Sequence, residues 1–222
     1  MSDILLVHGS CHGAWCWRDL IPALQALGHH PRAIDLPSHG DDTTPVNDVT
    51  LDSYAEAVLA ASTSQTVVLG HSMGGFAIGA AAQKDPAAMA QLIYLCAYVP
   101  APGMTLADMR KQAPSQPLMP AVRMADGGKS FTLDPTMTEA LFYNDCPTIA
   151  PTTVALPDTN RADALPRSYI RCMDDRTIPP AYQVTMTQDW PGTDVYEMPT
   201  GHSPFFTDPA GLARIIDTIV SR

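Results

Sequence analysis

Residues 66–76 read Thr-Val-Val-Leu-Gly-His-Ser-Met-Gly-Gly-Phe. They are the part of the sequence that is most informative about the fold. Its first four residues form an apolar run typical of a buried strand, and the small residues after Phe76 favour a helix. Between them, Gly70, Ser72 and Gly74 form a Gly-x-Ser-x-Gly pattern. On a sharp strand-to-helix turn this pattern exposes a nucleophilic serine, and the glycines let strand and helix approach closely. An ordinary tight turn is the alternative interpretation.

Strand and helix patterns alternate on both sides of this turn. Strands are predicted at residues 4–7, 32–36, 65–69, 92–97, 168–172 and 194–198, and helices at 15–27, 51–61, 76–83, 181–189 and 209–220. This alternation predicts an α/β fold, with a mostly parallel sheet, right-handed crossovers and helices on both faces.

The alternation stops between residues 100 and 166. This segment holds ten of the 21 prolines and five of the 11 methionines and has no clear strand, only short helical patterns at 103–110 and 135–144. We therefore expect residues 1–99 and 167–222 to form the core, and residues 100–166 to form a compact helical or irregular cap over one end of the sheet. Methionines suit an adaptable apolar lining. A loop region packed on the core is the alternative.

Length and charge restrict the function classes. The chain has 222 residues and a mass of 23.8 kDa, enough for one substantial domain but short for two with separate cores. Its formal net charge of −10 would repel nucleic acids and anionic membrane surfaces. No run approaches the roughly 18 apolar residues of a membrane span.

The cysteines indicate the compartment. Cys11, Cys16, Cys96, Cys146 and Cys172 are an odd number with scattered spacing, which matches neither a disulfide framework nor a zinc site. Free thiols in a reducing compartment are therefore expected. The amino terminus also lacks the basic stretch and long apolar core of a secretory signal. These features predict a cytoplasmic protein.

Groups that could assist Ser72 are predicted at the carboxyl ends of neighbouring strands, which meet at one edge of a parallel sheet. The helix after Ser72 points its amino terminus at this site, so the N–H of Met73 can stabilise negative charge. The N–H of Ser10, in the loop after the first strand, is the candidate for a second oxyanion donor. His8 and His12 are four residues apart but span a strand–loop junction, which disfavours a metal site.

A serine nucleophile needs a base that is itself oriented by another group. Among seven histidines, His202 is best placed, because it follows the last predicted strand on a loop at the same edge. His39 is a weaker candidate. The orienting acid is expected after the penultimate strand, where Asp174 and Asp175 are both candidates. The order serine, aspartate, histidine agrees with this type of turn.

These residues lie in five motifs, which are His-Gly-Ser-Cys-His-Gly-Ala-Trp-Cys-Trp at 8–17, Asp-Leu-Pro-Ser-His-Gly at 35–40, Gly-His-Ser-Met-Gly-Gly at 70–75, Asp-Arg-Thr-Ile-Pro at 175–179 and Gly-His-Ser at 201–203. With them, the sequence resembles the α/β-hydrolase superfamily, and in particular the branch of plant methylesterases of the salicylate-binding type, plant hydroxynitrile lyases and small bacterial esterases. The motifs run from residue 8 to residue 203, so the resemblance covers essentially the whole chain.

The resemblance assigns a role to each motif residue. It implies that Ser72 is the nucleophile, that His202 is the base and that Asp175, placed by the Asp-x-x-Ile-Pro spacing, is the acid. The backbone N–H groups of Ser10 and Met73 match the oxyanion hole. The segment 100–166 matches the helical cap of the family.

Two departures separate the chain from the lyases of this branch. The lyases carry a threonine in place of Gly9 and a lysine in place of Ser203, and that lysine supplies the positive charge for a departing cyanide. Lyase activity is therefore disfavoured. Ser72 also excludes a dehalogenase, whose nucleophile is an aspartate.

We therefore expect a serine carboxylesterase that hydrolyses small uncharged or weakly polar esters through an acyl-enzyme, with no metal or organic cofactor. The same triad could serve a thioesterase, a lactonase or a carbon–carbon bond hydrolase. A small-ligand-binding module on this scaffold is the alternative from another class.

Candidate substrate-binding residues lie in the first loop and in the cap. They are Cys11, His12, Met104, Met124, Phe142 and Tyr143, together with Met119, Phe131 and Leu141. For each of them a place in the core is an equally good interpretation.

Overall fold

A computed structural model describes residues 1–141, 148–149 and 165–222. Its centre is a six-stranded sheet in the order β2 (His30–Ile34), β1 (Asp3–Val7), β3 (Thr66–His71), β4 (Gln91–Leu95), β8 (Arg167–Cys172) and β9 (Val195–Met198). Every neighbouring pair in it is parallel. All six carboxyl ends therefore meet at one edge, and the predicted α/β fold is confirmed.

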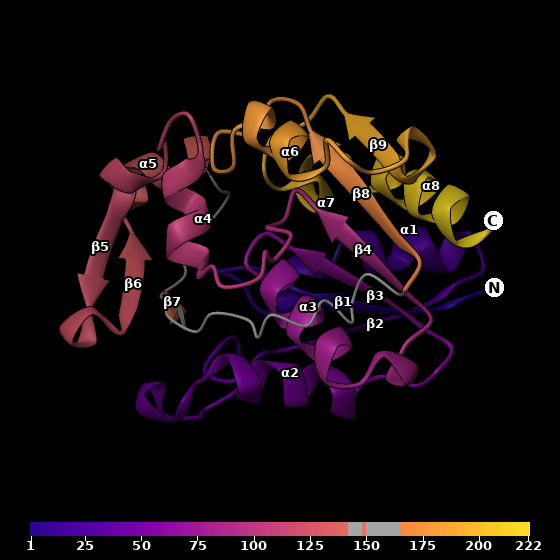
Figure 1. Ribbon diagram of the computed structural model, residues 1–222, viewed down its shortest axis with the longest axis horizontal. Helices are drawn as coiled ribbons and strands as arrows, with labels where there is room; N and C mark the ends of the chain where they lie inside the picture. Colours follow the sequence, from indigo (N-terminus) through magenta and orange to yellow (C-terminus); the bar gives the residue numbers. More distant parts are fainter. Residues whose placement is uncertain (142–147, 150–164) are drawn as a thin grey trace.

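Helices cover both faces of this sheet (Figure 1). One face carries α1 (Leu20–Ala26), α7 (Pro204–Thr207) and α8 (Pro209–Val220), and the other carries α2 (Leu51–Ala60), α3 (Gly74–Lys84) and α6 (Pro180–Met186). Strand residues alternate between the two layers. On β1, Ile4 and Leu6 belong to the core on the α1 side, whereas Leu5 and Val7 belong to the core on the α2 side. Since both faces are buried, the central strands β1, β3 and β4 contain continuous apolar runs.

Several elements differ from their predicted extent, and two of these differences have a clear structural reason. The helix predicted at 15–27 is divided into a 3₁₀ helix at Ala14–Trp17 and α1, with Arg18 and Asp19 exposed between them. This break buries both Trp17 and Leu20 completely. The strand predicted at 32–36 begins two residues earlier, because β2 is an edge strand and tolerates Pro31.

The other 3₁₀ helices in the described ranges are single turns. They lie at Val46–Asp48, Pro86–Ala88, Met119–Ala121, Asp126–Gly128 and Gly192–Asp194.

A second group of elements lies beyond the carboxyl edge of the sheet (Figure 1). It contains α4 (Leu106–Gln112), α5 (Pro135–Leu141) and a small antiparallel sheet of β5 (Val122–Ala125), β6 (Ser130–Leu133) and β7 (Thr148–Ile149). The expectation that this segment has no strand was wrong. β5 and β6 have four residues each, too few for alternation to be evident, and a turn of three residues with positive φ, 126–128, joins them.

The two helices of this group agree with the short helical patterns. The pattern at 103–110 corresponds to α4, which starts later because Thr105 caps it: the Thr105 side chain accepts from the N–H of Asp108 at 3.1 Å. The pattern at 135–144 corresponds to α5, and its last three residues lie outside the described ranges.

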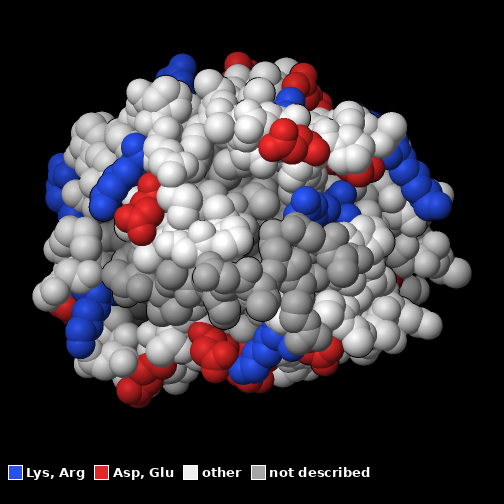
Figure 2. Space-filling model, in the orientation of Figure 1, with Lys and Arg blue, Asp and Glu red and all other residues white. Residues whose placement is uncertain are grey.

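The surface and the cysteines can be compared with the charge and redox expectations. On the face shown in Figure 2, Lys and Arg lie among Asp and Glu rather than in one continuous basic area. Cys11, Cys16, Cys96 and Cys172 are buried, and no disulfide joins any two of them. In the described ranges, no helix combines the length and apolar character that crossing a membrane requires.

The amino end of α3 packs directly against the segment after β4. A Cβ at Gly75 would overlap the carbonyl oxygen of Tyr98 and would lie 3.1 Å from the Cβ of Ala97. The N–H of Tyr98 in turn donates to the carbonyl of Ser72 at 3.2 Å. Only glycine allows α3 to lie this close to the segment that holds the Ser72 turn.

Gly75→Ala is therefore expected to lower the free energy of unfolding by about 1–3 kcal/mol, because the added methyl group overpacks this contact. Urea unfolding followed by circular dichroism measures the change. Gly192→Ala is the matched control, since a Cβ at Gly192 meets nothing within 4 Å. Equal stability of the two variants would contradict this account of the contact.

Candidate active site

Ser72 lies on the turn between β3 and α3 in an unusual backbone conformation. Its φ is +55°, in the left-handed region that few non-glycine residues adopt. Three hydrogen bonds of 3.2 Å hold it there. The Ser72 N–H donates to the carbonyl of Leu95, and the Ser72 carbonyl accepts from the N–H groups of Gly75 and Tyr98. The strained turn is thus supported by both β4 and α3.

Two further glycines leave the space that the backbone needs to form this turn. A Cβ at Gly70 would lie 2.8 Å from the carbonyl oxygen of Gly74, and a Cβ at Gly74 would lie 2.7 Å from the carbonyl oxygen of His8. Both distances are too short for a real side chain. Strand β3, helix α3 and the end of β1 therefore meet only because these positions are glycine.

Asp175 and His202 form a buried hydrogen-bonded pair at the same edge. Nδ1 of His202 lies 2.8 Å from Oδ2 of Asp175, and both side chains are 0% exposed. Asp175 follows β8 and His202 follows β9, so neighbouring parallel strands bring them together. Asp174, the other candidate for the acid, is exposed.

The Asp175 carboxylate is held by donors on both oxygens. Oδ1 accepts from the N–H groups of Thr177 at 2.7 Å and Ile178 at 2.9 Å. Oδ2 accepts from Nε2 of Gln183 at 3.0 Å as well as facing His202. Gln183 is fully buried on α6 and was not foreseen, because a glutamine within a helical pattern carries no sequence signal of such a contact.

The main chain of His202 is clamped by two neighbours. Its carbonyl accepts from Nε2 of His71 at 2.8 Å and from the thiol of Cys96 at 3.4 Å. The His202 and His71 rings lie 4.6 Å apart between centroids. Since His71 directly precedes Ser72, this contact ties the loop after β9 to the serine turn.

The loop after β1 lies against Ser72. A Cβ at Gly9 would be 2.7 Å from the Cβ of Ser72, and the Ser10 hydroxyl donates to Sδ of Met73 at 3.2 Å. The backbones of Ser10 and Met73 are therefore adjacent to the serine. These residues follow β1 and β3, the two strands on either side of the point where the strand order reverses.

A cavity of about 190 Å³ lies in front of Ser72. Its floor comes from the sheet edge and its walls come mainly from apolar side chains of the second group of elements. The described residues that line it are Ser10, Ser72, Met73, Tyr98, Leu106, Ala107, Arg110, Leu118, Met119, Val122, Met124, Phe131 and Thr177.

Some candidate substrate-binding residues lie in this wall and others do not. Met124 lines the cavity, as do Met119 and Phe131. Met104, which precedes α4, instead lines a second cavity of about 400 Å³ together with Met109 and Gln112 of that helix. It is not among the described residues that line the cavity in front of Ser72.

Cys11 and His12 are also placed differently from the expectation. Cys11 has a positive φ of 63° and packs with Ala121 and Leu133 in a small core. His12 is buried beside the rings of His71 and Phe205. Leu141 contributes its carbonyl to a hydrogen bond from Thr177 Oγ1 at 2.9 Å. Phe142 and Tyr143 lie outside the described residues.

The inner face of α4 was missed by sequence reasoning. Leu106, Ala107 and Arg110 have the spacing of one helix face and line the cavity together. The helix itself was expected from the sequence. Examining which of its faces combines apolar and charged residues would have identified these three residues. Tyr98, Leu118 and Thr177 carry no comparable sequence signal.

One group of possible metal ligands occurs among the described residues. Side-chain N or S atoms of His71, Cys96 and His202 lie within 4.8 Å of one another. However, Nδ1 of His202 faces Asp175, and Nε2 of His71 donates to a carbonyl. Burial also raises the pKa of the Cys96 thiol well above its usual range, which keeps it protonated. The group therefore fits a hydrogen-bond clamp better than a metal site.

Comparisons with known proteins agree with this geometry. The model of the alpha/beta hydrolase family matches residues 4–215. The chain is similar to a pyrethroid hydrolase of Sphingobium wenxiniae, with 31% identity across 97% of this chain and 86% of that protein. It is also similar to methylesterase 1 of Arabidopsis thaliana, with 30% identity across 96% of this chain and 93% of that protein. Among solved structures, a pyrethroid hydrolase from Sphingobium faniae superposes with a TM-score of 0.85 at 28% identity, covering 99% of this chain and 97% of that chain.

Buried histidines surround the serine turn. His8, His12 and His71 are at most 4% exposed. Loss of hydration disfavours their charged forms, so burial lowers the pKa of His8 and His71 well below 6.5 and that of His12 to about 3. These three imidazoles are therefore neutral in the folded protein at neutral pH.

This neutrality predicts a stability that falls with acidification. Below pH 6.5 the unfolded chain binds protons at these three histidines that the folded chain does not bind. The free energy of unfolding should therefore decrease from pH 6.5 downward, with a slope approaching about 4 kcal/mol per pH unit near pH 5. Urea midpoints at several pH values measure it. His12→Gln should reduce the slope by about one proton, whereas the exposed control His30→Gln should not; a flat profile between pH 7 and 5 would contradict the assignment.

Proposed function

This chain belongs to the alpha/beta hydrolase family and is an esterase of the carboxylesterase type, and from this premise we propose that Ser72, His202 and Asp175 are its catalytic triad. The observation that carries the proposal is the buried 2.8 Å contact between Nδ1 of His202 and Oδ2 of Asp175, beside a serine with a φ of +55°. Such a pair costs desolvation, and its typical use is to hold an imidazole in one tautomer.

In the proposed reaction, Oγ of Ser72 forms a bond to the ester carbonyl carbon while its proton passes to Nε2 of His202. The resulting oxyanion accepts hydrogen bonds from the N–H groups of Ser10 and Met73. When the bond to the alcohol breaks, His202 returns the proton to the departing alcohol. Water then attacks the acyl-enzyme by the same route, and the carboxylic acid leaves.

The contacts of Asp175 support the role that we propose for it, which is to orient the imidazole of His202. Thr177, Ile178 and Gln183 donate to its oxygens, which fixes the carboxylate in the plane that faces His202. The imidazole then presents Nε2 rather than Nδ1 toward the serine. His71 and Cys96 restrain the main chain of His202 but do not face the substrate.

We propose small esters as substrates, with segment 100–166 acting as the cap that selects them. In support, the cavity of about 190 Å³ is lined on the cap side by Leu118, Met119, Val122 and Phe131. Gly9 supports hydrolysis over lyase chemistry, because a threonine at this position would bring a Cβ to 2.7 Å from the Cβ of Ser72.

The proposed compartment is the cytoplasm. The support is that Cys11, Cys16, Cys96 and Cys172 are buried and that no disulfide joins any two of them, which fits a reducing environment.

Ser72→Ala should reduce kcat for p-nitrophenyl acetate and for simple methyl esters by about six orders of magnitude, to the background rate, because no other group can form the acyl-enzyme. Steady-state kinetics measure it, with thermal unfolding as the check on folding. Ser38→Ala is the matched control: Ser38 has a similar φ of +64° but lies outside the cavity. Retained turnover in Ser72→Ala would refute the triad, whereas tight binding with no product from the wild type would favour a binding module.

Asp175→Asn should lower kcat by about 10⁴-fold, because the amide no longer holds the imidazole in the reactive tautomer. Asp174→Asn changes the neighbouring, exposed carboxylate and should alter kcat less than about twofold. The same ester assay measures both. If Asp174→Asn is instead the variant with the large loss of kcat, the acid has been assigned to the wrong residue.

A further inference from the structure

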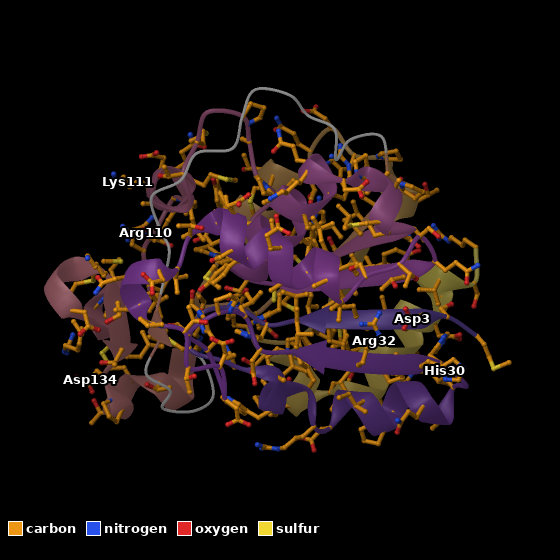
Figure 3. All side chains as sticks on the ribbon, turned by 90° about the horizontal axis from the view of Figure 1, so that it is seen from below. Asp3, His30, Arg32, Arg110, Lys111 and Asp134 are labelled. Atoms are coloured by element: carbon orange, nitrogen blue, oxygen red, sulfur yellow. The ribbon has the colours of Figure 1, made fainter. Side chains whose placement is uncertain are left out.

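The inner face of α4 places one charged side chain in the cavity that Ser72 lines. Leu106 and Ala107 are apolar, and Arg110 is one turn further along the same face. Among the described lining residues, Arg110 is the one that carries a formal charge. In Figure 3, Arg110 and Lys111 lie together at the cap end of the molecule, far from Asp3 and Arg32 at the other end.

The guanidinium of Arg110 is held in place by Gln116. Nη1 of Arg110 donates to Oε1 of Gln116 at 3.1 Å, and Nε2 of Gln116 donates back to the Arg110 carbonyl. A guanidinium has five N–H donors, and this arrangement uses one of them while fixing the orientation of the others. Gln116 thus acts as a brace within the turn that follows α4.

No acidic side chain in the described ranges forms an ion pair with Arg110. Its neighbours differ: Lys111 faces Asp108 at 3.6 Å, and Arg123 faces Asp134 at 2.7 Å. Although the chain has a net charge of −10, the half-buried Arg110 thus lies at a largely apolar wall with no acidic partner among the described residues. An anion entering the cavity would meet this charge with little competition from water.

The charge of Arg110 also acts on another group of the cavity. Burial raises the pKa of the Tyr98 phenol, and the positive charge of Arg110 opposes that rise. Tyr98 is the residue whose N–H holds the carbonyl of Ser72 at 3.2 Å. The guanidinium is therefore electrostatically close to the segment that supports the nucleophile.

We propose that Arg110 binds a carboxylate of the substrate, so that the preferred substrates are esters bearing a free carboxylate in addition to the ester group. Planar guanidinium and carboxylate groups match in a two-pronged contact, which orients as well as binds. Half-esters of dicarboxylic acids carry the carboxylate on the acyl side, and acyl esters of hydroxy acids carry it on the alcohol side. This inference rests on the proposed function of Ser72, His202 and Asp175.

The experiment compares two pairs of esters by titrating the acid that hydrolysis releases. The acyl-side pair is monomethyl glutarate and the neutral methyl ester in which an isopropyl group replaces the carboxylate. The first member of the alcohol-side pair is the acetate ester formed at the terminal hydroxyl of a hydroxybutanoate. The second is the neutral acetate ester in which an isopropyl group replaces the carboxylate. Within each pair, the readout is the ratio of kcat/KM for the charged ester to that for the neutral ester. This ratio cancels any general loss of active enzyme.

Arg110→Gln is expected to lower this ratio about 10- to 100-fold in at least one pair, the range typical of a lost hydrogen bond to a charged group. Arg110→Lys should give an intermediate ratio, because a lysine keeps the charge but not the planar fork. Lys111→Gln is the matched control. It removes the same charge from the next residue, which is exposed, and should change the ratio less than about twofold.

The outcomes separate this inference from the proposed function. A ratio that Arg110→Gln leaves unchanged in both pairs, in an enzyme that hydrolyses the neutral esters and loses this activity in Ser72→Ala, overturns the role of Arg110 and leaves the triad standing. A ratio that falls equally in Lys111→Gln shows a general charge effect and also overturns it. A wild type that hydrolyses none of the four esters overturns both proposals.

Discussion

The left-handed backbone of Ser72 is the constraint on which the rest of the site depends. A non-glycine residue at a φ of +55° is unfavourable by itself, so its neighbours must determine it. Hydrogen bonds to β4 and to the segment after it supply part of this support. The rest comes from Gly70, Gly74 and Gly75, whose missing side chains allow the sheet and α3 to close on the turn from both sides. Strain at one residue is thus held by packing across three elements.

The parallel sheet converts this local constraint into a site. Ser10, Ser72, Asp175 and His202 come from the carboxyl ends of β1, β3, β8 and β9, and of these strands only β8 and β9 are consecutive in the chain. Two groups that do not take part in the proposed reaction help to position His202. The contacts from His71 and Cys96 to the His202 carbonyl couple the final loop to the serine turn, so a shift of one would move the other.

Sequence patterns predicted most of the core because its signals are local and strong. The Gly-x-Ser-x-Gly turn and the buried strands can be predicted from residues that are close together in the sequence. Local patterns alone left Asp174 and Asp175 open, and the Asp-x-x-Ile-Pro spacing of the resembled family favoured Asp175; burial and four nearby donors support the same residue. The hairpin of β5 and β6 was missed because its stability depends on pairing rather than on a long pattern. Arg110 was missed because a helical arginine indicates a solvated surface until the opposite wall is known.

The neutral imidazoles around the serine turn have a consequence for the electric field in the site. In the proposed reaction, His202 carries a positive charge for a brief period while the acyl-enzyme forms, and the His71 ring lies 4.6 Å from it between centroids. If His71 and His12 were ionised, that transient cation would form against like charge in a medium that screens poorly. Because both rings stay uncharged, they behave as polarisable aromatic walls, and Asp175 is the charged group in contact with the ring. With His8, His12 and His71 neutral, His202 is the one of these four neighbouring histidines that is left to respond to the proposed reaction.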